Sequence, residues 1–110
     1  MDTNAPIRIA APTLDALITD IFAASGCARD EAARISHHLL GANLAGHDSH
    51  GVVRVPRYVE WQQAGHVVAG KQAEIVTDGG AFALLDGKWG FGQTVAPQAT
   101  ALGIERAERH

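Results

Sequence analysis

Apolar residues recur at helical spacing in the first quarter of the chain, which predicts an amphipathic helix with one buried stripe. Thr13 is the expected N-cap of this helix, and Asp15 would lie in its positively polarised first turn. Ser25-Gly26 should end it, because glycine tolerates the left-handed backbone that follows many helices. Ile7 to Ala10, just before the helix, suggest a short edge strand. The stripe consists of Leu14, Leu17, Ile18, Ile21 and Phe22.

The same spacing continues in a second predicted helix, which begins near Ala28 and ends near Gly46. Asp30 and Glu31 fall in its first turn, and Asp30 can pair with Arg34 one turn later. The small residues on the apolar face suggest close contact with another helix. That face comprises Ala28, Ala32, Ile35, Leu39 and Ala42.

A third helix is expected from about Val53 to Ala64, with Gly65 as its stop signal. Pro56 is compatible with the first turn of a helix, where its missing N–H has no intrahelical partner to lose. Three side chains should face inward: Val55, Tyr58 and Val59.

After Gly70 the spacing of apolar residues becomes typical of β-strands. Residues 73–77 and 81–86 are candidate strands, and Asp78-Gly79-Gly80 between them is a hairpin signal. Asp86-Gly87 supplies a second turn. A last helix should begin near Gln93, with apolar positions that include Val95, Ala99, Leu102 and Ala107. The expected fold is α+β: helices at the N-terminal side, a β-hairpin and a C-terminal helix, together forming part of a larger domain.

The last residues suggest that a longer protein contains this chain. Residues 104–110 keep the helical register without glycine or asparagine to cap it. A two-stranded hairpin also needs further packing to be stable. A native helical C-terminus is the alternative, because frayed helix ends are common.

Composition narrows the class of protein. The 110 residues are 46% hydrophobic and 19% charged, as in one small globular domain. The net charge of −3, with scattered Arg and Lys, argues against nucleic-acid binding. No apolar run suits a signal peptide or a membrane span. Cys27 is the one cysteine, which excludes an internal disulfide framework. A cytoplasmic location is therefore expected.

Candidate chemistry is concentrated between residues 47 and 54. An enzyme that oxidises or reduces a small 2-hydroxy or 2-oxo acid needs a cation for the carboxylate, and arginine binds one with two parallel hydrogen bonds. It also needs a group that exchanges a proton near neutral pH, which suits histidine. His50 and Arg54, four residues apart, would share a face if helical. Ser49 could orient the imidazole, and Gly51 permits close approach of a ligand.

Structural roles for the same residues remain open at this stage. Asp48 or Ser49 could be a helix N-cap, and His50 could be a packed interface histidine. Arg54 could be a surface cation or a partner of Asp48. His47 and His50 could ligate zinc only with a third ligand, which the sequence does not offer.

Other motifs have simpler explanations. Gly90-Phe91-Gly92 lacks the third glycine of a dinucleotide loop and is better interpreted as a turn into a helix. Trp61 and Trp89 could stack on a nicotinamide, but a core or interface position is favoured. Cys27 is expected to serve in packing.

The segment from Ala45 to Tyr58, AGHDSHGVVRVPRY, resembles the malate/L-lactate dehydrogenase family that also contains sulfolactate and ureidoglycolate dehydrogenases and piperideine-2-carboxylate reductases. This family is distinct from the Rossmann-type lactate and malate dehydrogenases. Its Ser-His-Gly-x-x-Arg hallmark is the specific part of the match. Leu84-Leu85-Asp86-Gly87 and Gly90-Phe91-Gly92-Gln93 are also similar, as is the opening helix.

The resemblance implies roles for three residues. Ser49 and His50 would form a catalytic proton relay that a downstream aspartate completes, and Arg54 would bind the substrate carboxylate. The aspartate, a later His-Phe-Gly-like segment and the nicotinamide-binding domain have no counterpart here. Residues 1–110 would thus be the N-terminal portion of the substrate domain, inactive alone.

The implied whole protein is an NAD- or NADP-dependent oxidoreductase and a homodimer. It would act on small 2-hydroxy or 2-oxo acids or cyclic imino acids. The alternative is a non-catalytic helical interaction module or a degenerate remnant of the same fold.

Overall fold

The computed structural model describes residues 4–110. It confirms the α+β class, with three helices, a two-stranded antiparallel hairpin and a last helix in that order. Two short 3₁₀ turns, η1 and η2, connect the second helix to the third. The elements are α1 (Ala11–Ala24), α2 (Arg29–Leu44), η1 (Asp48–His50), η2 (Val52–Arg54), α3 (Val55–Gln63), β1 (Glu74–Asp78), β2 (Ala83–Asp86) and α4 (Gly92–Arg109).

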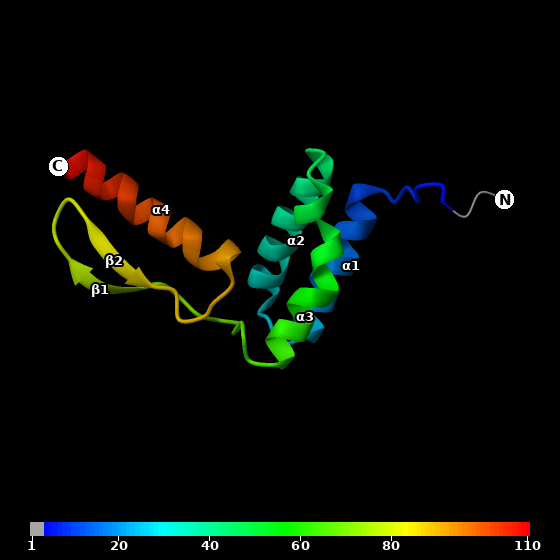
Figure 1. Ribbon diagram of the computed structural model, residues 1–110, viewed down its shortest axis with the longest axis horizontal. Coiled ribbons are helices and arrows are strands. Elements are labelled where there is room, and N and C mark those ends of the chain that lie inside the picture. The colour runs from blue at the N-terminus through cyan, green and yellow to red at the C-terminus, as the bar shows by residue number, and fades with distance from the viewer. Residues whose placement is uncertain (1–3) are drawn as a thin grey trace.

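The molecule is elongated and consists of a helical body and an arm (Figure 1). The body contains α1, α2 and α3, while the arm contains the hairpin with α4 alongside it. The extents are 61 × 29 × 20 Å and the radius of gyration is 16.7 Å. A compact chain of this length would have a radius of gyration of about 13 Å. Much of the arm is therefore far from the core of the body.

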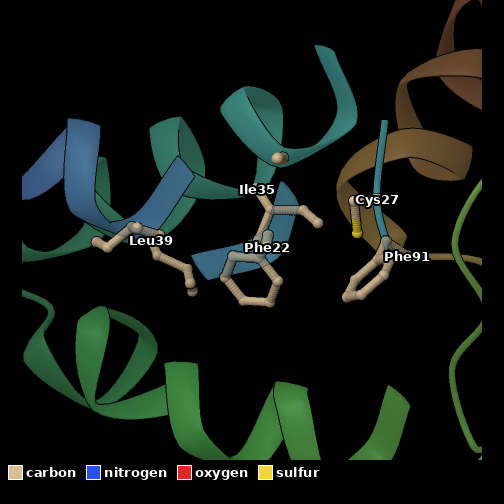
Figure 2. Close-up of a cluster of buried hydrophobic side chains, with 7 residues drawn as sticks. Phe22, Cys27, Ile35, Leu39 and Phe91 are labelled. Carbon is tan, nitrogen blue, oxygen red and sulfur yellow. The ribbon is translucent and has the colours of Figure 1, made fainter. Parts of the chain in front are cut away.

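The hydrophobic core lies in the body at the interface of α1 and α2. Phe22 of α1 and Ile35 and Leu39 of α2 are almost fully buried there. Figure 2 shows that Phe91, which precedes α4, points into the same cluster. Its ring meets the Phe22 ring edge to face at 6.1 Å between centroids. Phe91 thereby attaches the arm to the core of the body.

A buried carboxylate forms a second attachment between the body and the arm. Glu31 of α2 is only 4% exposed. One carboxylate oxygen accepts a hydrogen bond from Gly70 N at 2.8 Å, and the other accepts one from the Thr94 hydroxyl. The Thr94 hydroxyl in turn accepts a hydrogen bond from the Arg34 guanidinium at 2.8 Å. Glu31 thus joins α2, the loop before the hairpin and the first turn of α4.

Three predictions about the N-terminal side are wrong. Residues 7–10 form no strand, and Ala10 rather than Thr13 is the N-cap of α1. The helix begins one residue before Pro12, because proline is pre-organised for a first helical turn. Asp15 therefore falls beyond the first turn. Its carboxylate accepts a hydrogen bond of 2.6 Å from Ser36 of α2 instead.

The buried face of α2 differs in part from the prediction. Ala32 is fully buried as expected, but Ala28 is exposed and Ala42 is only half-buried. Glu31 and Ser36 are buried instead. Apolar spacing missed both polar residues, because each is buried only through a hydrogen bond to another element.

The remaining boundaries agree closely with the predictions. Helix α2 begins directly after Ala28, and Gly46 and Gly65 have the positive φ that follows helix ends. The Asp30–Arg34 pair forms at 3.7 Å. The third helix starts later than expected, at Val55, because the residues before it form 3₁₀ turns.

The hairpin packs against α4 through polar contacts. Gln98 of α4 accepts a hydrogen bond from Ala73 N at 2.7 Å. Arg106 of α4 donates to both carboxylate oxygens of Asp78, at 2.9 and 2.7 Å. The expected turn after β2 is present and closes with a bond from Gly90 N to Gly87 O. These contacts supply the packing that a lone hairpin needs.

Cys27 is buried in the core of the body, as the packing interpretation predicted. Burial raises the pKa of the Cys27 thiol to about 11, and the nearby Glu31 carboxylate adds to this shift. The folded state therefore favours the neutral thiol.

Replacing Thr94 with valine should destabilise the fold, since it leaves a buried Glu31 oxygen and the Arg34 guanidinium without this partner. We expect a loss of about 1–3 kcal/mol in the free energy of unfolding. This corresponds to a fall of roughly 5–15 °C in Tm, measured by circular dichroism. Thr100→Val is the matched control, because Thr100 is an exposed residue of the same helix. Equal Tm values for the two variants would contradict the bridging role of Thr94.

The Cys27 thiol should react slowly in the folded chain. A pKa of about 11 in place of 9.0 leaves about 100-fold less thiolate at pH 8. Stability linked to this group is present below the unfolded pKa near 9 and is lost as pH rises toward 11. Dithionitrobenzoate at pH 8 should modify the native chain at least about 100-fold more slowly than the urea-unfolded chain. Similar rates would show that the thiol is accessible and ionised.

Candidate functional site

The hallmark segment forms two consecutive 3₁₀ turns on the surface between α2 and α3. His50 N donates to His47 O at 3.0 Å and Gly51 N to Asp48 O at 3.1 Å, which closes η1. Arg54 N donates to Gly51 O at 3.0 Å and closes η2. Gly51 lies between the turns with φ −97° and ψ −146°, outside the helical region. The two turns therefore form a bent loop.

Ser49 and His50 are hydrogen-bonded to each other. Ser49 Oγ lies 3.0 Å from His50 Nδ1. When Nδ1 carries no proton, the hydroxyl donates to it and the ring proton is on Nε2. The imidazole rings of His47 and His50 also meet edge to face, with 4.2 Å between their centroids. Both Ser49 and His50 are exposed, so a ligand can reach this pair.

Arg54 is attached to the same pair through the backbone. Its Nε donates to the Ser49 carbonyl oxygen at 2.8 Å. No ion pair or hydrogen bond within residues 4–110 uses its two Nη atoms, and the side chain is exposed. The Nη1–Nη2 edge of a guanidinium is suited to a carboxylate. The structure thus brings Ser49, His50 and Arg54 together and leaves one such edge of Arg54 directed to solvent.

The spacing argument that placed His50 and Arg54 on one helical face does not apply, because Gly51 interrupts the helix. The observed contacts also differ from the structural roles considered for Asp48, Ser49 and Arg54. The N-cap of η1 is His47, and no side chain caps this turn. Asp48 accepts a hydrogen bond from Asn43 at 2.9 Å, whereas Arg54 bonds to a carbonyl. Neither an N-cap role nor an Asp48–Arg54 pair is therefore observed.

Asn43, near the end of α2, is the neighbour of this loop that sequence analysis missed. Besides its bond to Asp48, its side-chain oxygen accepts a hydrogen bond from Val52 N at 2.8 Å. A polar residue in the last turn of a helix carries no local signal of such a contact. Only the path of the loop back across α2 brings the side chain into place.

A separate groove of about 850 Å³ lies between the body and the arm. Tyr58 and Trp61 of α3 line one side, where their rings stack at 5.8 Å. Phe91 and residues of α4 line the other. Trp61 is 40% exposed and Trp89 is 79% exposed, so neither is a core residue. Ser49, His50 and Arg54 do not line this groove.

The other histidines do not extend the candidate site. His37 and His38 are adjacent on α2 and line different hollows. In the part of the chain that the structure describes, no group of three or more His, Cys, Asp or Glu side chains could hold a metal ion.

Comparisons with known proteins agree with the motif. A family described as malate/L-lactate dehydrogenase matches residues 9–110. Hydroxycarboxylate dehydrogenase B of Escherichia coli K12 is 44% identical over 103 residues, which are 94% of this chain and 28% of the relative.

Solved structures show the same fold. The malate dehydrogenase from Pyrococcus horikoshii OT3 has a TM-score of 0.86 and 31% identity, covering 94% of this chain and 30% of that one. The Δ1-piperideine-2-carboxylate reductase from Pseudomonas syringae has a TM-score of 0.80 and 27% identity, covering 94% and 31%.

The chain spans less than a third of the length of these relatives, but the match extends over nearly all of its own residues. The family match includes all of the body and the arm from residue 9 onward. It also includes the loop that carries Ser49, His50 and Arg54. The chain therefore belongs to the malate/L-lactate dehydrogenase family.

Proposed function

We propose that this chain is the N-terminal part of an NAD- or NADP-dependent oxidoreductase and supplies the proton-transfer and carboxylate-binding groups of its active site. The substrate class is a small 2-hydroxy or 2-oxo acid or a cyclic imino acid. The observation that carries the proposal is the Arg54–Ser49 contact. It holds a guanidinium with a free Nη edge next to a serine–histidine pair.

Arg54 would bind the substrate carboxylate through Nη1 and Nη2. Its Nε is already bonded to the Ser49 carbonyl, so the position of the guanidinium is restrained before substrate arrives. Such preorganisation reduces the entropy lost when a substrate is positioned. The substrate carbon next to the carboxylate would then lie close to His50.

His50 would exchange the proton. In the direction of reduction, an imidazolium gives its Nε2 proton to the substrate oxygen, or to the nitrogen of an imine, as hydride reaches carbon. In the direction of oxidation, neutral Nε2 takes the proton back. In both states Nδ1 would carry a proton and donate it to Ser49 Oγ, which would keep the ring oriented.

The packing around Gly90 differs from that of an open loop for cofactor phosphates. Gly90 and Gly92 flank Phe91, but a Cβ on Gly90 would lie 2.9 Å from the Lys71 Cβ and 3.0 Å from Gly87 O. Close packing, rather than an open cradle, thus explains that glycine. We place the nicotinamide-binding domain and the relay aspartate in the remainder of a longer enzyme.

The proposed enzyme is a cytoplasmic homodimer that binds no nucleic acid. Residues 1–110 would be the N-terminal portion of its substrate domain and inactive alone. Within the described residues, no helix combines the length and apolar character that a bilayer span requires. The alternative, a non-catalytic interaction module, is favoured by one observation, the open apolar groove between α3 and α4.

A chimera would test the proposal. Residues 1–110 replace the matching segment of Escherichia coli hydroxycarboxylate dehydrogenase B, which is 44% identical. We expect the chimera to reduce 2-oxo acids with NADH or NADPH. Arg54→Met should lower kcat/KM by about 100-fold or more, because truncating one partner of a charge-assisted pair costs several kcal/mol. The isolated chain should show no turnover.

Arg57→Met is the matched control, since Arg57 is an exposed arginine three residues away that pairs with Glu60 at 3.3 Å. It should keep kcat/KM within about twofold, as expected for a surface ion pair. Circular dichroism would verify that both variants fold. A folded chimera with no activity, or an Arg54→Met variant as active as the parent chimera, would favour the interaction module.

A further inference from the structure

The side chain of Asn43 joins both halves of the hallmark loop to α2. Its Oδ1 accepts a hydrogen bond from Val52 N, the first residue of η2, at 2.8 Å. Its Nδ2 donates to the carboxylate of Asp48, the first residue of η1, at 2.9 Å. One amide thus holds the starting residues of the two turns that carry Ser49, His50 and Arg54.

Gly51 shows how tightly this amide fits against the loop. Gly51 is buried, whereas His50 before it is exposed and Val52 after it is half-buried. A Cβ at this position would lie 2.1 Å from Asn43 Oδ1 and 2.7 Å from its Nδ2. The φ of −97° is negative, so a left-handed backbone is not what requires glycine here. The amide occupies the space that a side chain at residue 51 would need.

The two 3₁₀ turns are short and lie mostly at the surface, with Val52 alone packing partly against the core. Each is three residues long, and no residue of η1 or η2 is buried. Short 3₁₀ segments have poorer hydrogen-bond geometry than α-helices. The Ser49–His50 bond and the Arg54–Ser49 contact lie on this exposed backbone. Their geometry therefore depends on what holds the turns against α2.

We propose that Asn43 is a positioning residue, whose amide sets the geometry of the Ser49–His50 pair and of Arg54 by binding Asp48 and Val52 at once. The inference rests on the proposed function of these three residues. Asn43 itself touches none of them through a hydrogen bond, so it acts through the loop backbone.

Exchanging the Asn43 amide and the Asp48 carboxylate tests the positioning role of Asn43. Asn43→Asp keeps an acceptor for Val52 N but sets two carboxylates against each other, which should detach η1. The double variant Asn43→Asp/Asp48→Asn restores a donor and an acceptor in reversed order, and should therefore restore the loop. Asp48→Asn alone keeps an acceptor for the Asn43 amide and should retain the parent geometry.

Two measurements report the outcome. In the 110-residue chain, ¹⁵N spectra of the His50 ring report its tautomer and its hydrogen bonding to Ser49. We expect Asn43→Asp to move these signals, and the double variant to return them. In the chimera, Asn43→Asp should lower kcat by about 10-fold to 100-fold, as loss of a supporting contact does at other sites. The double variant should recover kcat.

Gln62→Ala is the matched control for a merely structural effect. The Gln62 amide also bridges two elements with two hydrogen bonds, to Ser25 O at 2.8 Å and from Ser25 Oγ at 2.9 Å, away from the hallmark loop. It should lower Tm without moving the His50 signals. The proposal fails if Asn43→Asp leaves His50 and kcat unchanged, or if the double variant gives no recovery. If Arg54→Met also retains activity, the proposed function fails with it.

The variant Gly51→Ala tests the fit of the Asn43 amide against the loop by changing the loop itself. Its Cβ should push the amide of Asn43 out of place and reproduce the His50 shift of Asn43→Asp, with a loss of Tm. Gly103→Ala is the control, because that Cβ meets no atom within 4 Å and adds a better helix former to α4. A Gly51→Ala chain with parent His50 signals would contradict the tight fit.

Discussion

A single buried carboxylate determines how the two parts of this molecule meet. Glu31 lies in the first turn of α2, where the helix dipole favours negative charge. It reaches the loop before the hairpin and the first turn of α4. Isolated burial of a carboxylate is costly, so these hydrogen bonds are a condition for the packing of α4 against the body. Phe91 then enters the core beside the same contact. The elongated outline follows, because the rest of the arm extends past this junction.

The helices and the hairpin were predictable from sequence to a large extent, because their signals are local. Apolar spacing and terminal glycines placed α2 and α3 within a few residues, and Asp78-Gly79-Gly80 placed the hairpin. Glu31 and Ser36 were missed as buried residues because their burial depends on partners far along the chain. The N-terminal strand was a wrong prediction for a related reason. A short apolar stretch becomes a strand only when another strand pairs with it.

The candidate site was predictable as a set of residue types but not as a geometry. Ser49, His50 and Arg54 came from the hallmark, and their roles remain a proposal. Helical spacing could not predict how they meet, since Gly51 divides the segment into two turns. The contact that brings Arg54 to Ser49 uses a backbone carbonyl, which has no signature in sequence. The contacts of Asn43 could not be predicted either, because its partners are a backbone N–H and a residue in a bent loop.

The hydrogen bond from Arg54 Nε to the Ser49 carbonyl would have a consequence for stereochemistry. One nitrogen is bonded to the Ser49 carbonyl, which restrains the directions from which the Nη edge can meet a planar carboxylate. For the proposed substrates, this restraint would favour one side of the flat carbonyl carbon for the arrival of hydride. A lysine in place of Arg54 could supply charge but not this restraint, because its ammonium group has no plane. The chirality of the product would then depend on the Arg54–Ser49 hydrogen bond, which makes no contact with the reacting carbon.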